Sequence, residues 1–237
     1  MAQHVIARRV GHLYPSGGIS DHELQRMAPE GLRVLVTRMP FRDTSRESDI
    51  ALAREVESHA KLLADAKVEL IAFNCTAASM LAGPGVLERR IETATGIPAL
   101  TTIQAVMEGL ARFEARKVAL FTAYRPDVVE EERHFLAAHG IVVVAEAHIP
   151  CPDPVTQGNL PPSAWLELVA GTDCRDADAI LCSCAGIEIS PVLSAIELTT
   201  GKPVVASNAA LLWLILNRMG WRQPRYGFGR LLAEDFP

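Results

Sequence analysis

The sequence predicts an α/β fold of two pseudosymmetric Rossmann-like lobes, each a parallel sheet flanked by helices, with the active site in the cleft between the lobes. Short runs rich in Val, Ile and Leu alternate with longer amphipathic stretches, which is typical of a mainly parallel sheet. A strand that ends in cysteine occurs twice, and a similar phrase follows each copy. The chain has 237 residues, of which 49% are hydrophobic, so it can bury a large core.

Six strands are expected where short aliphatic runs are bounded by polar or turn-forming residues. They span residues 9–14, 33–37, 68–74, 118–122, 141–145 and 179–183. Helices are expected over residues 50–66, 79–90, 103–113, 127–139, 162–169 and 209–219. In the first of these helices Leu52, Val56, Leu62 and Leu63 recur near helical spacing. Asp49 is expected to cap its N-terminus. The Pro-rich segment 150–162 is expected to be a crossover loop.

An internal repeat supports two related lobes. VELIAFNCTAAS at 68–79 resembles ADAILCSCAGIE at 177–188, and TGIPALTTIQAV at 95–106 resembles TGKPVVASNAAL at 200–211. Two such coincidences favour a pseudo-two-fold relation over chance similarity between Val/Ala-rich strands. We therefore expect one unit of two interleaved lobes over residues 1–237. Lobe 1 would contain about 1–115 with the C-terminal segment, and lobe 2 about 116–210.

Composition excludes several classes of function. The net charge is −5 and no basic block is longer than a pair of arginines, so nucleic acid is not an expected partner. Neither a signal peptide nor an apolar run long enough for a bilayer is evident, so we expect a cytoplasmic protein without a membrane partner. The five cysteines have no paired spacing, and no Cys-x-x-Cys or helical His pair accompanies them. Neither a disulfide framework nor a metal site is therefore expected.

Cys75 and Cys184 are the candidate catalytic residues because each ends a predicted strand, where ligands bind in open parallel sheets. A helix N-terminus expected after each cysteine would lower the pKa of its thiol towards neutrality. Two thiols on opposite sides of a carbon can exchange protons with both of its faces, and a thiolate can add to a carbon–carbon double bond. The alternative is that each is a buried structural cysteine.

Further polar groups are expected around the same cleft. Tyr124 directly follows a strand and can donate a hydrogen bond to a carboxylate or an enolate oxygen. The other candidates for substrate binding are Pro15, Ser16, Gly17, Thr76, Ser183, Ala185, Ser207 and Asn208. The alternatives are a surface tyrosine, ordinary N-caps for the Ser and Asn residues, and a plain turn for the loop that begins at Pro15.

Several motifs together resemble the aspartate/glutamate racemase superfamily, and most closely its maleate cis-trans isomerase and arylmalonate decarboxylase branch. They are the strand with Cys75 and Thr76, TAY at 122–124, CSCAGI at 182–187, PVVASNAALLW at 203–213 and YGFGRLL at 226–232. The resemblance implies that Cys75 and Cys184 flank the substrate, and that Thr76 and Tyr124 bind its carboxylate. It also implies that the loop from Pro15 to Gly18 contacts the substrate.

Decarboxylases of this branch look like members that keep the second cysteine and carry glycine at the first. The presence of Cys75 therefore favours a cofactor-independent isomerase, either a cis-trans isomerase or a racemase, that acts on a small carboxylic acid. Ser16 lies in a loop where maleate isomerases tend to carry Asn, and Ala77 lies where the decarboxylases carry Ser. Amino acids, hydantoins and other cyclic carbon acids therefore stay open as substrates beside maleate.

Two other functions stay open. One is an arylmalonate-type decarboxylase in which Cys184 donates the proton and Cys75 has no role. The other is a binding module that holds its ligand in the same cleft. The resemblance also leads us to expect a homo-oligomer.

Overall fold

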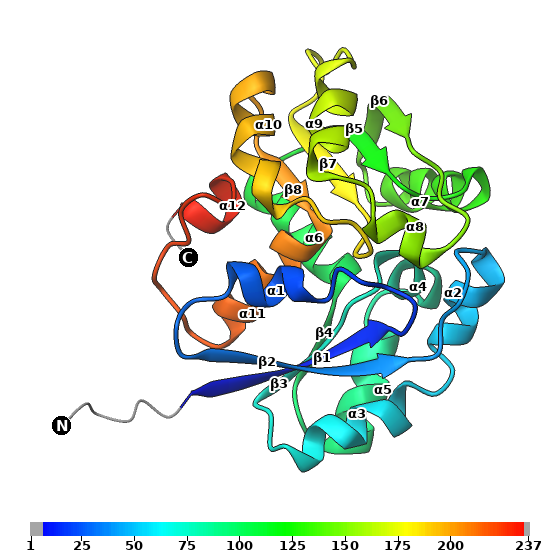
Figure 1. Cartoon of the computed structure of the whole chain (residues 1–237), viewed down its shortest axis with the longest axis vertical. Coiled ribbons are helices and arrows are strands. Elements are labelled where there is room, and N and C mark those ends of the chain that lie inside the picture. Colours follow the sequence, from blue (N-terminus) through cyan, green and yellow to red (C-terminus); the bar gives the residue numbers. More distant parts are fainter. Residues whose placement is uncertain (1–6, 235–237) are drawn as a thin grey trace.

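The computed structural model describes residues 7–234 as two four-stranded parallel sheets (Figure 1). The first sheet has the order β2-β1-β3-β4, with β1 Arg8–Pro15, β2 Leu32–Met39, β3 Leu70–Phe73 and β4 Ala99–Thr101. The second has the order β6-β5-β7-β8, with β5 Lys117–Thr122, β6 Val142–His148, β7 Ala179–Ser183 and β8 Val204–Ala206. The two orders correspond strand for strand, which confirms the pseudosymmetric α/β fold.

Helices separate the strands in both halves of the chain. The first half contains α1 His22–Met27, α2 Arg46–Leu52, α3 Val56–Asp65, α4 Thr76–Ala82, α5 Val86–Thr95 and α6 Thr102–Arg112. The second contains α7 Pro126–Ala138, α8 Pro154–Gly158, α9 Pro162–Ala170, the 3-10 turn η1 Ser190–Val192, α10 Leu193–Thr200, α11 Ser207–Arg218 and α12 Arg230–Ala233. No helix within residues 7–234 is long and apolar enough to cross a membrane.

All six predicted strands are present, and the structure adds β4 and β8. Each added strand has three residues and belongs to one of the two TG phrases of the repeat. Strands this short carry no recognisable alternation. They nevertheless pair in parallel with β3 and β7, the strands that precede the two cysteines.

Three sequence predictions about helices are wrong. The single helix expected over 50–66 is two helices, α2 and α3, and Ser45 rather than Asp49 caps the first, because the Ser45 side chain accepts from the N–H of Ser48 at 3.2 Å. The helix expected over 79–90 is broken at the Gly83-Pro84-Gly85 sequence, where both glycines have positive φ. The Pro-rich segment is not all loop, since it contains α8.

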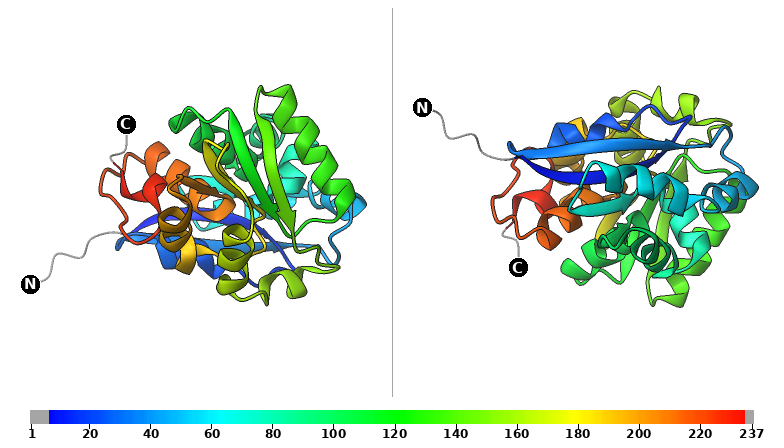
Figure 2. Two further views of the ribbon diagram at one scale, coloured as in Figure 1. Left: turned by 90° about the horizontal axis from the view of Figure 1, so that it is seen from above. Right: turned by 90° about the horizontal axis from the view of Figure 1, so that it is seen from below.

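Helix α11 joins the two halves. It follows β8 of the second sheet but packs against α6 and α1 of the first half. In Figure 1, α11 (orange) lies close to α1 at the end of the first sheet, and Figure 2 shows the C-terminal segment beside the first strands in both views. Every residue from Ser207 to Leu216 is buried. The core around this helix is therefore shared by both sheets.

Candidate active site

A small cavity lies where the carboxyl ends of the two sheets meet, and we call it the cysteine cavity. Its volume is about 30 Å³, far below the several hundred Å³ of sites for drug-sized ligands. Cys75 enters it two residues after the end of β3, and Cys184 enters it directly after β7. The residues that line it are Tyr14, Pro15, Gly18, Phe41, Thr44, Asp49, Cys75, Tyr124, Pro154, Gln157, Cys184, Ala185 and Gly186.

Asp49 is the hydrogen-bond partner of Cys75. The Cys75 Sγ donates to Asp49 Oδ1 at 3.5 Å, and both side chains are buried. Asp49 lies on α2, which packs against α4, the helix that begins after Cys75. Burial raises the pKa of Asp49 to about 7, and the carboxylates of Asp43 and Asp127 act in the same direction. A carboxyl group with this pKa can accept and return a proton near neutrality.

Cys184 has a neutral partner instead. Its Sγ donates to Gln157 Oε1 at 3.8 Å and accepts from the backbone N–H of Gly186 at 3.3 Å. An added Cβ at Gly186 would lie 2.7 Å from Gln157 Oε1 and would displace that amide group from its present position. Burial raises the pKa of Cys184 to about 12, and the Gly186 N–H opposes this shift. Cys184 is therefore held as a thiol, the form that donates a proton.

The two partners occupy corresponding places in the two halves. Asp49 lies on α2, the first helix after β2, and Gln157 lies on α8, the first helix after β6. Strands β2 and β6 are themselves equivalent edge strands of their sheets. The pseudosymmetric site is therefore chemically asymmetric, with a carboxyl group beside Cys75 and a carboxamide beside Cys184.

The expectation that both thiols lie at helix N-termini with lowered pKa values is wrong. Cys75 does precede the short helix α4, but a turn and η1 follow Cys184. Burial, followed by the charge of Asp49, raises the pKa of Cys75 well above its usual range. Desolvation disfavours the charged thiolate, and in this cavity it outweighs the backbone N–H groups that favour the thiolate.

Tyr124 presents a free hydroxyl group in the cavity. Its ring is buried, and its Oη has no hydrogen-bond partner among the described residues. The hydroxyl of Tyr14, the other tyrosine of the cavity, donates to the carbonyl of Ala185 at 3.3 Å. A buried hydroxyl without a partner is costly, so Tyr124 is suited to donate to a bound ligand.

The structure brings five of the eleven sequence-predicted site residues to the cavity wall. These are Cys75, Cys184, Pro15, Tyr124 and Ala185. The other six do not line it, and their polar groups form hydrogen bonds within the protein. Ser16 and the Gly17 N–H bond to the backbone of Phe41, and Ser183 donates to Glu132. The remaining three are Thr76, Ser207 and Asn208.

Thr76, Ser207 and Asn208 form two bridges between the cysteine-bearing segments. In one bridge Ser207 Oγ accepts from Thr76 Oγ1 at 2.8 Å and from the backbone N–H of Cys184 at 3.1 Å. In the other, Asn74 Nδ2 donates to Asn208 Oδ1 at 2.9 Å, and Asn208 Nδ2 donates to the carbonyl of Ala185 at 3.1 Å. Both bridges connect a neighbour of Cys75 with the segment at Cys184, so they fix the separation of the two thiols.

Asp49 and Gln157 are the functional candidates that sequence reasoning missed. A signal for Asp49 was present, because it lies three residues before Leu52 and seven before Val56, both of which are buried. An acidic residue on such an apolar helical face needs an explanation. For Gln157 the signal was weaker. Asp153 inside the Pro-rich segment is a possible helix N-cap, and in the structure it does cap α8 by accepting from the Thr156 N–H at 2.9 Å.

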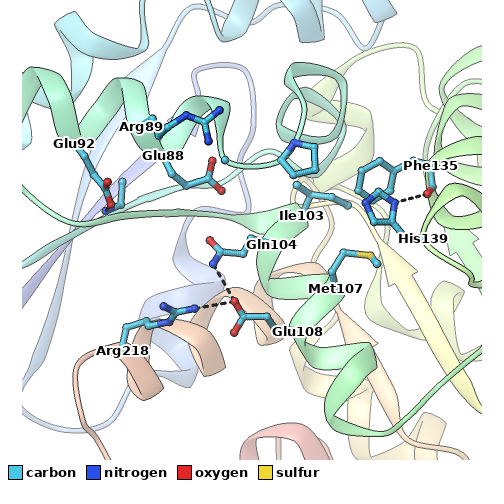
Figure 3. A pocket seen from close by; sticks show the side chains of 13 residues that line it. Glu88, Arg89, Glu92, Ile103, Gln104, Met107, Glu108, Phe135, His139 and Arg218 are labelled. Carbon is cyan, nitrogen blue, oxygen red and sulfur yellow. Dashed lines mark hydrogen bonds and ion pairs between the residues drawn. The ribbon is translucent and has the colours of Figure 1, made fainter.

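A larger open pocket of about 520 Å³ lies elsewhere, between α5, α6 and the end of α7 (Figure 3). None of the cysteines lines it. Several of its polar groups bond to each other, since Glu108 Oε1 accepts from Gln104 at 2.9 Å and from Arg218 at 2.8 Å (Figure 3). No Cys, Ser or Thr side chain lines this pocket, so the cysteine cavity is the better candidate for an active site.

The chain is similar to enzymes of known function along nearly its whole length. The chain is 28% identical to maleate isomerase of Nocardia farcinica over 96% of both chains. It is 27% identical to arylmalonate decarboxylase of Bordetella bronchiseptica, over 93% of this chain and 94% of that enzyme. A crystal structure of maleate isomerase from Pseudomonas putida with maleate shares the fold, with a TM-score of 0.92 at 23% identity over 97% of this chain and 99% of that one. Residues 13–232 match the family described as arylmalonate decarboxylase, and the chain therefore belongs to that family.

Proposed function

We propose that the protein is an isomerase of small carboxylic acids in which Cys75 is the nucleophile or base and Cys184 is the proton donor. The observation that carries this proposal is the meeting of two buried thiols, one from each sheet, in one small cavity with the free hydroxyl of Tyr124. Relatives over nearly the whole chain are named maleate isomerase, which supports the same chemistry.

For an unsaturated acid the steps balance without an external reactant. The Cys75 thiolate forms a bond to one alkene carbon, and the π electrons move to the other carbon, which takes the proton of Cys184. Rotation about the new single bond follows. Cys184 then recovers its proton, the carbon–sulfur bond breaks and the trans double bond forms. A crystal structure of the Nocardia farcinica maleate isomerase is described as holding a covalently bound succinylcysteine intermediate, an adduct of this kind.

The Tyr124 hydroxyl would donate to the substrate carboxylate. Negative charge develops on this carboxylate when the Cys75 sulfur adds to the alkene carbon that is β to it. One well-placed donor of this kind contributes about 2.7 to 4 kcal/mol to transition-state stabilisation.

No Lys, Arg or His is among the residues that line the cavity, whereas Asp49 is. The charge balance therefore suits an acid with a single carboxylate better than a dianion, because a second negative charge would lie unpaired in a low dielectric.

The first test of this function is turnover by the two cysteine variants. Cys75→Ala and Cys184→Ala should each lose turnover by a factor of about 10² or more, while the circular dichroism spectrum stays native because each change removes one buried sulfur. Proton NMR in D2O with maleate, its monoamide, phenylmalonate, amino acids and hydantoins would identify the reaction. The proposal fails if the double variant keeps wild-type turnover.

The family match also supports a second function, a decarboxylase of arylmalonates in which Cys184 protonates the product. Loss of phenylmalonate with formation of a deuterated arylacetate would identify it in the same NMR experiment. Cys75→Gly should then keep or raise the activity, whereas the isomerase would lose activity with that change. The pairing of Cys75 with Asp49 favours the isomerase.

We further infer that the protein works as one unit of two interleaved lobes, in the cytoplasm and as a homo-oligomer. Lobe 1 would contain about 1–115 with the C-terminal segment, and lobe 2 about 116–210. The packing of α11 against α6 and α1 supports this division. Sedimentation analysis would give the oligomeric state.

A further inference from the structure

We propose that Asp49 is the proton acceptor of Cys75, so that the two residues act as a dyad that shares one proton. This inference deepens the proposed function and rests on it for the role of Cys75. The contact that carries it is the 3.5 Å hydrogen bond from Cys75 Sγ to Asp49 Oδ1. Among residues 7–234, the Cys75 thiol is the side chain that forms a hydrogen bond with the Asp49 carboxyl group.

The step balances within the dyad. The S–H bond of Cys75 breaks, an O–H bond forms on Asp49, and the negative charge moves from the carboxylate to the sulfur. The net charge of the dyad stays the same, so no proton has to leave the buried cavity. The transfer therefore forms the Cys75 thiolate without placing a second negative charge in the cavity.

The surroundings of Asp49 favour its acceptance of a proton. Asp43, in the loop before α2, and Asp127, on α7, add negative potential at Asp49, and Cys184 and Tyr124 face it across the cavity. The nearby cations are engaged elsewhere: Arg46 pairs with Glu131 at 2.9 Å and Arg125 with Asp127 at 3.8 Å. The Asp49 carboxylate therefore has no counter-ion among the residues that line the cavity.

The opposite half of the site lacks this device. Gln157 lies at the corresponding position beside Cys184, and an amide oxygen cannot hold a transferred proton as a carboxylate does. Cys184 therefore keeps its proton until the substrate takes it. The carboxyl group of Asp49 therefore makes Cys75 the nucleophile, and the carboxamide of Gln157 leaves Cys184 as the proton donor.

The dyad predicts a specific pH dependence. Burial raises the pKa of Asp49 to about 7, so below about pH 7 both residues are protonated and Cys75 is unreactive. Above about pH 7 the dyad has lost one proton, and the population with a Cys75 thiolate and a protonated Asp49 reaches a constant level. In Asp49→Asn no carboxylate competes for that proton or opposes the charge on sulfur, so the thiolate population keeps increasing with pH until the thiol titrates at alkaline pH.

Alkylation tests this without knowledge of the substrate. Full-length protein would be treated with iodoacetamide between about pH 5 and about pH 10, and modification of Cys75 and Cys184 would be measured by peptide mass spectrometry. For wild type we expect the Cys75 rate to rise up to about pH 7 and then to level off, and the Cys184 rate to rise only at strongly alkaline pH. For Asp49→Asn we expect no plateau near pH 7, so that the Cys75 rate at about pH 9 exceeds the wild-type rate by about 10-fold or more.

Glu47→Gln is the matched control, because it removes an exposed carboxylate from the same helix. Its Cys75 profile should coincide with that of wild type. An Asp49→Asn profile that also coincides with wild type would overturn the inference. If that variant does not fold, the wild-type profile alone decides, since a Cys75 rate that keeps rising from about pH 7 to about pH 9 without a plateau also overturns the inference. A protein without isomerase activity that keeps the plateau above about pH 7 would refute the proposed function and leave the dyad intact.

Discussion

At the scale of single residues, removal of the Tyr124 hydroxyl should affect substrate binding without affecting the stability of the fold. It is buried and has no hydrogen-bond partner among residues 7–234. Tyr124→Phe should therefore leave the melting temperature unchanged or slightly raised, while kcat/KM falls by a factor of about 10² to 10³. The measurements are differential scanning fluorimetry and the turnover assay.

Tyr226→Phe serves as the control for that change, because Tyr226 is 76% exposed and its hydroxyl should affect neither quantity. Full activity in Tyr124→Phe would show that the substrate carboxylate is bound by other groups. A large loss of stability would show instead that the hydroxyl has a structural partner, such as an ordered water.

At the scale of elements, the first turn of α11 holds the two cysteine-bearing segments together. Ser207→Ala removes one oxygen that accepts from both Thr76 Oγ1 and the Cys184 N–H. Two buried donors then lack partners, and the free energy of unfolding should fall by about 1 to 3 kcal/mol. Urea denaturation measures this, with Ser58→Ala on the exposed face of α3 as a control that should change stability by less than about 0.5 kcal/mol. An unchanged stability would contradict the bridging role.

The same elements show what the sequence could predict. The strands with aliphatic runs were predictable, and so was the position of Cys75 and Cys184, because each cysteine lies within two residues of the end of such a strand. Asp49 was not predicted to reach Cys75, because the break between α2 and α3 changes which face of the helix is buried. Gln157 was missed because α8 has only five residues. The hydroxyl bridges depend on contacts between residues 131 positions apart, which no local pattern contains.

At the scale of the whole molecule, the interleaved core predicts that the two halves unfold together. α11 continues from the second sheet and packs on helices of the first half, so neither sheet keeps its core without the other half. Circular dichroism and tryptophan fluorescence should give coincident urea transitions, because Trp165 reports on the second half and Trp213 on α11. Two separated midpoints would contradict a shared core.

The exchange of a carboxyl group for a carboxamide at equivalent places gives the cavity a handedness. A site with identical partners beside both thiols would present the same environment to either face of a planar carbon. Here one face meets the Asp49 side and the other meets the Gln157 side. Sulfur therefore adds to one face of a prochiral carbon and the proton arrives from the opposite side, so that the covalent adduct forms as a single stereoisomer.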